Sequence, residues 1–141
     1  MLKENPLFVG LGDCSYGIKE NMVKPLDTPK YELYDAHTLL NQLMGDEVLA
    51  GTIINVFLDD MPHQIDLLKE FVDQGKPEQA GAQAHKIKGA MANIGSPALQ
   101  KTTHAMEKAG RANDIATLIQ LVPTLERQFI ELRQILERGQ D

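Results

Sequence analysis

The 141-residue sequence has little of several residue types: one cysteine, no tryptophan, three tyrosines and four phenylalanines. The single cysteine, Cys14, cannot form a disulfide within the chain, which favours a reducing compartment, the cytoplasm. No apolar run approaches the ~20 residues that a membrane-spanning helix needs, and no signal-peptide pattern opens the chain. We therefore expect a cytoplasmic fragment that makes no membrane contact, with a parent protein anchored in the inner membrane as a compatible possibility.

The sequence also lacks an excess of positive charge. Its 14 Lys and Arg residues against 20 Asp and Glu residues leave a net charge of −6. This sign argues against nucleic acid or an anionic membrane surface as the main partner. Four histidines are present, but none follows a glutamate by three residues as in di-iron helical bundles, and only Asp60-x-x-His63 approximates that pattern. We expect no metal site and no cofactor in this chain.

The first thirty residues are rich in proline and glycine and show no sustained hydrophobic period. They predict a poorly ordered linker or tail over residues 1–30, with vector-derived residues as the alternative. From residue 35 onward the apolar residues recur at helical spacings. The pattern predicts a short helix over residues 35–43 and a long helix that opens at Asp46. Pro62 should kink this long helix or loosen a backbone bond near Leu58, and Gly75 fits its C-terminal cap.

Three more helices are expected. Pro77 fits the first turn of a helix that stops at Gly95, and Ser96-Pro97 fits the start of the next, which ends at Gly110. Asn113 is expected to cap a last helix that runs to near residue 138, with a kink or break at Pro123. Short loops favour antiparallel neighbours. The predicted fold of residues 31–141 is all-α, an antiparallel four-helix bundle with a short additional N-terminal helix.

The helix expected over residues 77–95 has two unlike faces. At 100° per residue, the positions within about 60° of His85 are Glu78, Gly81, Ala82, Lys88, Gly89 and Ala92. The opposite face is apolar except for Gln83 and is expected to join the core; it carries Ala80, Ile87, Ala90, Met91 and Ile94. Glycine inside a helix costs roughly 0.5–1 kcal/mol relative to alanine. Two glycines beside one exposed histidine indicate that something comes close to it, with a merely solvated histidine as the alternative.

The run His85-x-x-Lys88-Gly89, with Ala84 before it and Ile94-Gly95 after it, resembles the signature of histidine-containing phosphotransfer (HPt) domains. The resemblance covers residues 31–141 and extends to Met44-Gly45-Asp46-Glu47, Phe57-Leu58 with Pro62, and residues 99–107. It implies a phosphorelay carrier, in which the histidine accepts a phosphoryl group from an aspartyl phosphate on a response-regulator receiver domain and passes it to another receiver. By this resemblance, His85 is the phosphorylation site, Lys88 an electrostatic partner of the phosphoryl oxygens, and Gly89 a clearance position for the docking receiver.

The residues themselves suit this chemistry. An imidazole in water loses its proton near pH 6.5, so at pH 7 one ring nitrogen offers a lone pair without a dedicated base. A lysine at i+3 lies about 5–6 Å away between Cβ atoms, within reach of a transferred phosphoryl group. The surface expected to dock the receiver comprises Gly81, Ala82, Lys86, Gly89 and Ala92. The Mg²⁺ ion and the acidic cluster of the reaction are expected on the receiver.

The chain is expected to be a carrier and not an enzyme, because it contains no glycine-rich ATP-binding boxes. The Pro/Gly-rich lead-in favours a C-terminal module of a hybrid sensor histidine kinase, monomeric as an isolated domain. His104 is expected to be a partly exposed polar residue. The basic positions are expected to be ordinary surface or the rim of the docking face: Lys101, Lys108 and Arg111. The alternative function is a non-phosphorylated helical docking module for a receiver or a partner helix.

Overall fold

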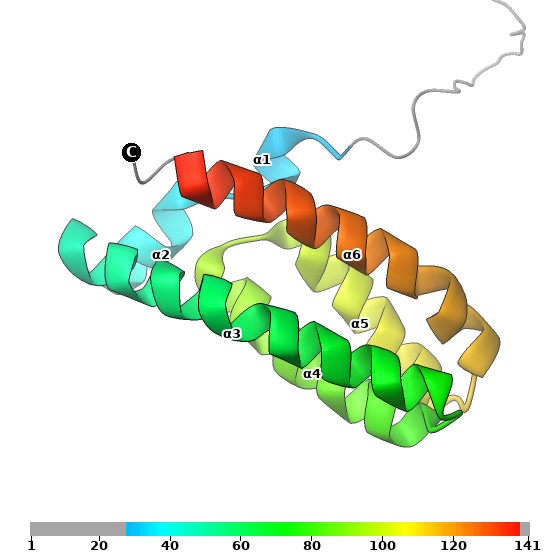
Figure 1. Ribbon diagram of the computed structural model, residues 1–141. Helices are drawn as coiled ribbons and strands as arrows, with labels where there is room; N and C mark the ends of the chain where they lie inside the picture. Colours follow the sequence, from blue (N-terminus) through cyan, green and yellow to red (C-terminus); the bar gives the residue numbers. More distant parts are fainter. Residues whose placement is uncertain (1–27, 139–141) are drawn as a thin grey trace, which may run out of the picture.

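Four long helices run antiparallel to their neighbours in the chain and pack around an apolar core (Figure 1). The structure is a computed structural model that describes residues 28–138. The long helices are α3 (Glu47–Asp73), α4 (Pro77–Ile94), α5 (Pro97–Arg111) and α6 (Ile115–Arg138). Within the described residues, two short helices precede them, α1 (Lys30–Leu33) and α2 (Ala36–Gln42). The expected all-α bundle is confirmed, and its N-terminal addition consists of two short helices instead of one.

The N-terminal helices are attached to the turn between α4 and α5. The backbone N–H of Asp35 donates to the carbonyl of Gly95 at 2.7 Å. Gly95 has a left-handed φ of 97°, and a Cβ at this position would lie 2.6 Å from the Asp35 carbonyl oxygen. Glycine is therefore required here both by the helix end and by the chain that packs against it. Cys14 and nearly all of the predicted linker lie outside the described residues, and the boundary at residue 31 stays a prediction.

The limits of α3 follow from local capping, as the sequence predicts. The Asp46 side chain accepts from the Leu49 N–H at 3.0 Å and satisfies a free donor of the first turn. At the other end Gly75 has a φ of 68°, and the Lys76 N–H donates to the Phe71 carbonyl at 2.9 Å. This is the hydrogen-bond pattern of a Schellman cap, which ends the helix one turn before α4 begins at Pro77.

The two prolines inside helices, Pro62 and Pro123, affect their helices differently. Pro62 cannot donate to the Leu58 carbonyl, and Arg133 of α6 donates to that oxygen instead, at 3.4 Å. The loosened bond expected near Leu58 is thereby confirmed, and it links α3 to α6. Pro123 lies inside α6, which continues unbroken through it, so the break considered at that position is wrong.

The connection between α5 and α6 differs from the sequence-based prediction. α5 continues one residue past Gly110, to Arg111, and Asn113 adopts a left-handed φ of 57° at the end of α5. The residue that caps α6 is Asp114, whose side chain accepts from the Thr117 N–H at 3.1 Å and from the Thr117 hydroxyl at 2.6 Å. The prediction that Asn113 caps the last helix is therefore wrong by one residue. Asparagine tolerates the left-handed conformation, which suits it to the preceding helix end.

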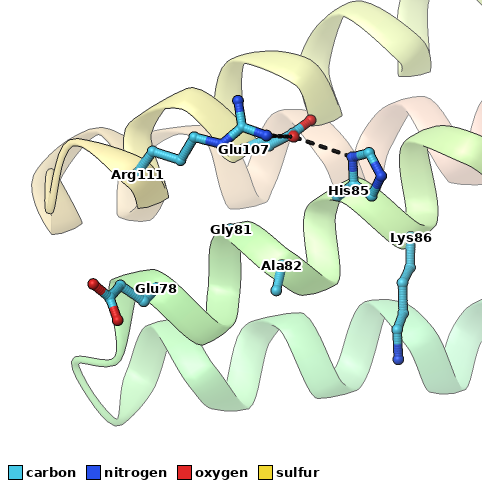
Figure 2. A pocket seen from close by; sticks show the side chains of 7 residues that line it. All are labelled: Glu78, Gly81, Ala82, His85, Lys86, Glu107 and Arg111. Atoms are coloured by element: carbon cyan, nitrogen blue, oxygen red, sulfur yellow. Dashed lines mark hydrogen bonds and ion pairs between the residues drawn. The ribbon is translucent and has the colours of Figure 1, made fainter.

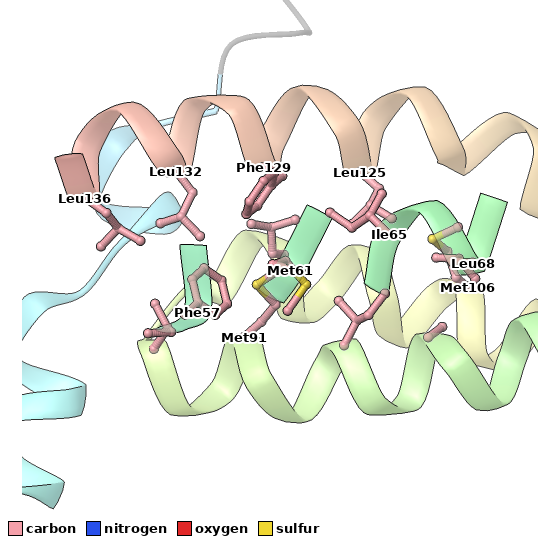
Figure 3. Close-up of a cluster of buried hydrophobic side chains, with 14 of the residues drawn as sticks. Phe57, Met61, Ile65, Leu68, Met91, Met106, Leu125, Phe129, Leu132 and Leu136 are labelled. Carbon is pink, nitrogen blue, oxygen red and sulfur yellow. The ribbon is translucent and has the colours of Figure 1, made fainter. Parts of the chain in front are cut away.

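The core lies between the four long helices and is filled mainly by leucine, isoleucine, methionine and two phenylalanine rings (Figure 3). Phe57 of α3 and Phe129 of α6 meet with ring centroids 6.2 Å apart. Gln83, the polar position on the otherwise apolar face of α4, is buried and donates to the side-chain oxygen of Gln64 on α3 at 2.7 Å. This hydrogen bond explains how a polar residue is accommodated there. No helix within residues 28–138 is long and apolar enough to cross a bilayer.

Candidate functional site

His85 projects into solvent from the middle of α4. Its side chain is 63% exposed, whereas Ile87 and Met91 on the opposite face of the same helix are buried. The outward orientation expected from the helical period is confirmed. Figure 2 shows the imidazole standing between α4 and α5, with one ring nitrogen directed toward α5.

This ring nitrogen, Nδ1, contacts the side chain of Glu107. The sequence did not predict a role for Glu107 in the site. Glu107 lies on α5, its side chain is only 3% exposed, and its Oε2 lies 3.1 Å from His85 Nδ1 (Figure 2). A buried carboxylate is costly unless it is paired and hydrogen-bonded. The surroundings of Glu107 meet this requirement.

Basic side chains surround the Glu107 carboxylate. Lys88 Nζ donates to Oε1 at 2.7 Å, and the Arg111 guanidinium donates to Oε2. His104 Nδ1 lies 3.9 Å from Oε1. The hydrogen bond from Lys88 is the largest cause that lowers the pKa of the Glu107 carboxyl, against the opposing effect of burial, and Arg111 adds to the lowering. Glu107 is therefore ionised at neutral pH and acts only as a hydrogen-bond acceptor.

An acceptor beside Nδ1 decides the tautomer of the imidazole. Because the Glu107 carboxylate cannot donate, the proton of a neutral His85 ring resides on Nδ1 and is donated to Oε2. The lone pair then lies on Nε2, which is on the side of the ring away from Glu107 (Figure 2). The site presents a fixed nucleophilic nitrogen to solvent.

Two glycines bring α5 close enough for this contact. A Cβ on Gly81 would lie 3.1 Å from the Gly110 Cα, and a Cβ on Gly110 would lie 2.6 Å from the Gly81 Cα. Gly81 is buried by this helix crossing. The expectation that Gly81 belongs to the exposed face around His85 is wrong, because α5 occupies that side of α4.

Gly89 is in the opposite situation. It is exposed, and a Cβ built on it would meet nothing within 4 Å. The fold therefore gives no packing reason for a glycine at this position, which leaves open space one helical turn from His85. Ala82 is exposed and Ala92 is half-buried, so the surface around the imidazole carries little bulk.

A shallow pocket of about 520 Å³ lies along α4 on the Nδ1 side of the imidazole. Its lining combines the small residues of α4 with charged side chains of both helices: Glu78, Gly81, Ala82, His85, Lys86, Glu107 and Arg111. Lys86 extends away from His85, toward the α3 side of α4 (Figure 2). Lys88, in contrast, is 28% exposed and bound to Glu107. Within the described residues, no group of three or more His, Cys, Asp or Glu side chains is placed to hold a metal ion.

A sequence signal for Glu107 existed but is weak. Glu107 lies one helical turn after Thr103 and one before Gly110, and both of these neighbours are buried. A glutamate on a buried helix face requires a partner. The sequence cannot name that partner, because His85 is 22 residues away and on another helix.

Replacing Glu107 with glutamine should reduce the loss of stability that acid causes. Because the folded-state pKa of Glu107 is below its ordinary value of 4.5, its stabilising contribution is complete above about pH 4.5 and is lost as the pH falls below that value. Urea unfolding at pH 7 and at about pH 3.5, followed by circular dichroism, measures the free energy of unfolding. The wild type should lose more of it between these pH values than Glu107→Gln.

The matched control for this experiment is Glu126→Gln. Glu126 also binds a lysine, with its Oε2 2.6 Å from Lys69 Nζ, but its side chain is 40% exposed and that of Lys69 38%. Such surface pairs contribute little to stability. The control should retain the acid sensitivity of the wild type, and equal sensitivity in Glu107→Gln would contradict the buried, ionised state of Glu107.

Comparison with known proteins gives one match. A family model described as "Hpt domain" matches residues 52–138, which include α4, α5, α6 and most of α3. A search of curated proteins and a search of solved structures found no match. The matched range contains His85, Lys88 and Glu107.

Proposed function

We propose that this chain, which belongs to the Hpt domain family, carries a phosphoryl group on His85 between receiver domains. Members of this family take part in phosphotransfer in two-component systems, interact with receiver domains, and are phosphocarriers and not kinases. The imidazole of His85 carries the phosphoryl group, and Glu107 and Lys88 assist the transfer.

The transfer step begins at His85 Nε2. Its lone pair attacks the phosphorus of an aspartyl phosphate on the receiver, so the N–P bond forms while the P–O bond to the aspartate breaks. The aspartate leaves as a carboxylate, and the Nδ1 proton stays between the ring and Glu107. The same bonds form and break in reverse when a second receiver takes the phosphoryl group.

Glu107 assists because the ring gains positive charge as the N–P bond forms. The carboxylate lies 3.1 Å from Nδ1 and is already ionised and oriented before the receiver arrives. A fixed anion beside a developing cation stabilises the transition state without reorganisation during the reaction. On the receiver, acidic groups would hold a Mg²⁺ ion, and that ion would neutralise charge on the phosphoryl oxygens.

The observation that carries this proposal is the pairing of an exposed imidazole with a buried carboxylate. A surface that only docks a partner needs no fixed tautomer on its histidine, so this pairing favours phosphotransfer over the docking-module alternative. Incubation with purified receiver domains phosphorylated by acetyl phosphate should label the chain. The label should be acid-labile and base-stable, and mass spectrometry should locate it on His85. Absence of label from every receiver of the source organism would count against the proposal.

Lys88 and Lys86 provide a matched comparison within this function. Lys88→Ala is expected to slow transfer from a receiver about tenfold, because a hydrogen bond to a charged group contributes about 1.5 kcal/mol and Lys88 holds Glu107. Lys86→Ala should change the rate by less than about twofold, since exposed charges contribute little. Quenched-flow transfer of ³²P from the receiver measures both rates. Equal effects of the two substitutions would remove the special role of Lys88.

A further inference from the structure

A hollow lies at the end of the bundle where α2 meets the beginning of α3 and the end of α6 (Figure 1). Its volume is about 590 Å³, and Glu47 alone is charged among the nine described residues that line it. They are Tyr34, Ala36, Leu40, Glu47, Ala50, Gly51, Ile54, Ile135 and Leu136. None of these residues belongs to α4 or α5, so this α2–α3–α6 hollow is distinct from the site at His85. An engineered cavity of about 150 Å³ accommodates benzene, so the hollow has room for more than one large apolar side chain.

A glycine without a packing reason lies in this lining. Gly51 is the single glycine of α3, and a Cβ built on it would meet nothing within 4 Å. Glycine inside a helix costs stability relative to alanine, because its backbone loses more freedom on folding. Ala50 and Ile54, on the same face of α3, are buried, so Gly51 leaves open space beside the core. This space indicates that a further segment approaches α3 here.

The sequence that precedes the described residues contains a segment of matching chemistry. Leu7-Phe8-Val9 is the single run of three large apolar residues within residues 1–27. It lies in the longest uncharged stretch of that sequence, residues 5–12. Three such side chains are unfavourable in water and gain free energy when an apolar surface covers them. The hollow offers an apolar surface with little charge, as the run requires.

The chain is long enough to bring this run to the hollow. The described chain begins at residue 28, six residues before Tyr34 of the lining, and Thr28 is twenty residues after Phe8. Twenty residues with random-coil statistics have an end-to-end distance of about 25 Å, against a length of about 40 Å for the 27 residues of α3. A tethered segment meets such a surface at a millimolar effective concentration. This tether favours it over a second copy or another protein, which must bind from solution.

We propose that Leu7-Phe8-Val9 occupies the α2–α3–α6 hollow of its own chain, with the phenylalanine ring over Gly51. The Glu47 carboxylate can accept hydrogen bonds from the backbone of the docked segment, and the Tyr34 hydroxyl can donate to it. Burial raises the pKa of this hydroxyl, which therefore keeps its proton. The docked run contacts neither α4 nor α5, so it leaves the surface around His85 uncovered. This attachment is additional to the proposed phosphotransfer function and does not depend on it.

The test uses Cys14, the single cysteine of the chain, to attach a nitroxide spin label. Docking of Phe8 places Cys14 six residues from the hollow, at most about 22 Å along an extended chain. Paramagnetic broadening is measured on the isoleucine methyl signals of the full-length, isotope-labelled chain. The signals of Ile54 and Ile135, which line the hollow, should be broadened strongly. Ile115, twenty residues before Ile135 on α6 and about 30 Å away along the axis, should keep a sharp signal.

Two variants of the full chain test the two sides of the contact. Phe8→Asp removes the apolar anchor, and Gly51→Leu fills the hollow. Each should lower the ratio of docked to undocked chains, and with it the paramagnetic relaxation rate at Ile135, by at least about tenfold. The matched controls are Tyr16→Asp in the same segment and Thr52→Leu in the same turn of α3, where the side chain is exposed and outside the lining. Both controls should keep the wild-type broadening.

Each other outcome overturns the proposal. Equal broadening at Ile115 and Ile135 in the wild type would show that the run does not dock in the hollow. Broadening at Ile135 that survives either Phe8→Asp or Gly51→Leu would show that another residue or another surface holds the segment. Phe8 lies outside the helices of the bundle, so its variant remains decisive even if Gly51→Leu fails to fold, which circular dichroism detects.

A mixed sample distinguishes docking within one chain from docking between chains. It combines spin-labelled chains without isotope label and isotope-labelled chains that carry Cys14→Ser. Sharp Ile135 signals in this sample support docking within one chain, whereas broadened ones assign the hollow to the segment of a second copy and overturn the proposal. All of these results are independent of whether a receiver labels His85, so failure of the carrier function and failure of this attachment are separate findings.

Discussion

Replacing His85 with glutamine is expected to abolish labelling of the chain by phosphorylated receivers while leaving the bundle folded. His85 is the exposed imidazole whose Nδ1 is bound by Glu107, and glutamine has no nitrogen lone pair that attacks phosphorus. The side chain is mostly exposed, so its removal leaves no cavity in the core. Autoradiography after incubation with a ³²P-labelled receiver measures the label, and far-UV circular dichroism measures the helix content.

The control for this substitution is His104→Gln. His104 is also an exposed histidine near Glu107, but its Nδ1 is 3.9 Å from the carboxylate, beyond hydrogen-bond distance. Label should persist in this variant. A label that survives His85→Gln and disappears in His104→Gln would move the phosphorylation site to the other histidine.

Adding one methyl group at Gly110 is expected to destabilise the bundle by about 2 kcal/mol, in the range typical of an overpacked contact. A Cβ there would lie 2.5 Å from the Pro77 carbonyl oxygen and 2.6 Å from the Gly81 Cα. These are backbone atoms, so α4 and α5 must move apart to accommodate it. Since Glu107 reaches His85 across the same crossing, transfer from a receiver should slow as well. Urea unfolding and quenched-flow transfer measure the two effects.

Gly89→Ala is the matched control and should have the opposite effect on stability. This glycine lies inside α4 with open space where the Cβ would be, so alanine should stabilise the chain by about 0.5–1 kcal/mol through helix propensity. A wild-type free energy of unfolding in Gly110→Ala would show that the close crossing of α4 and α5 is incorrect. Destabilisation by Gly89→Ala would show that this position is not open.

The two glycines of α4 show where inference from the sequence ends. Both fall on the His85 face of a helical wheel, and the sequence predicts the same role for both. The structure separates them, because α5 crosses at Gly81 and leaves Gly89 uncovered. A helical wheel gives directions around one helix and contains no information on which direction a neighbouring helix approaches.

Relations within a helix or at its ends are determined by the sequence alone. The caps at Asp46 and Gly75, and the carbonyl of Leu58 that Pro62 cannot reach with an N–H, depend on residues within about one turn of each other. The predicted cap of α6 was wrong by one residue because the adjacent residues Asn113 and Asp114 both suit helix ends. Local physical rules act over such short separations, so they can be applied to a sequence without knowledge of the fold.

The tertiary structure decided what surrounds the histidine. Glu107 reaches His85 because two glycines let α4 and α5 approach closely. These contacts join residues far apart in the chain, and they depend on how the helices cross once their apolar faces are buried together. The sequence alone therefore singled out the exposed histidine, while the packing of the helices supplied the buried carboxylate that orients its ring.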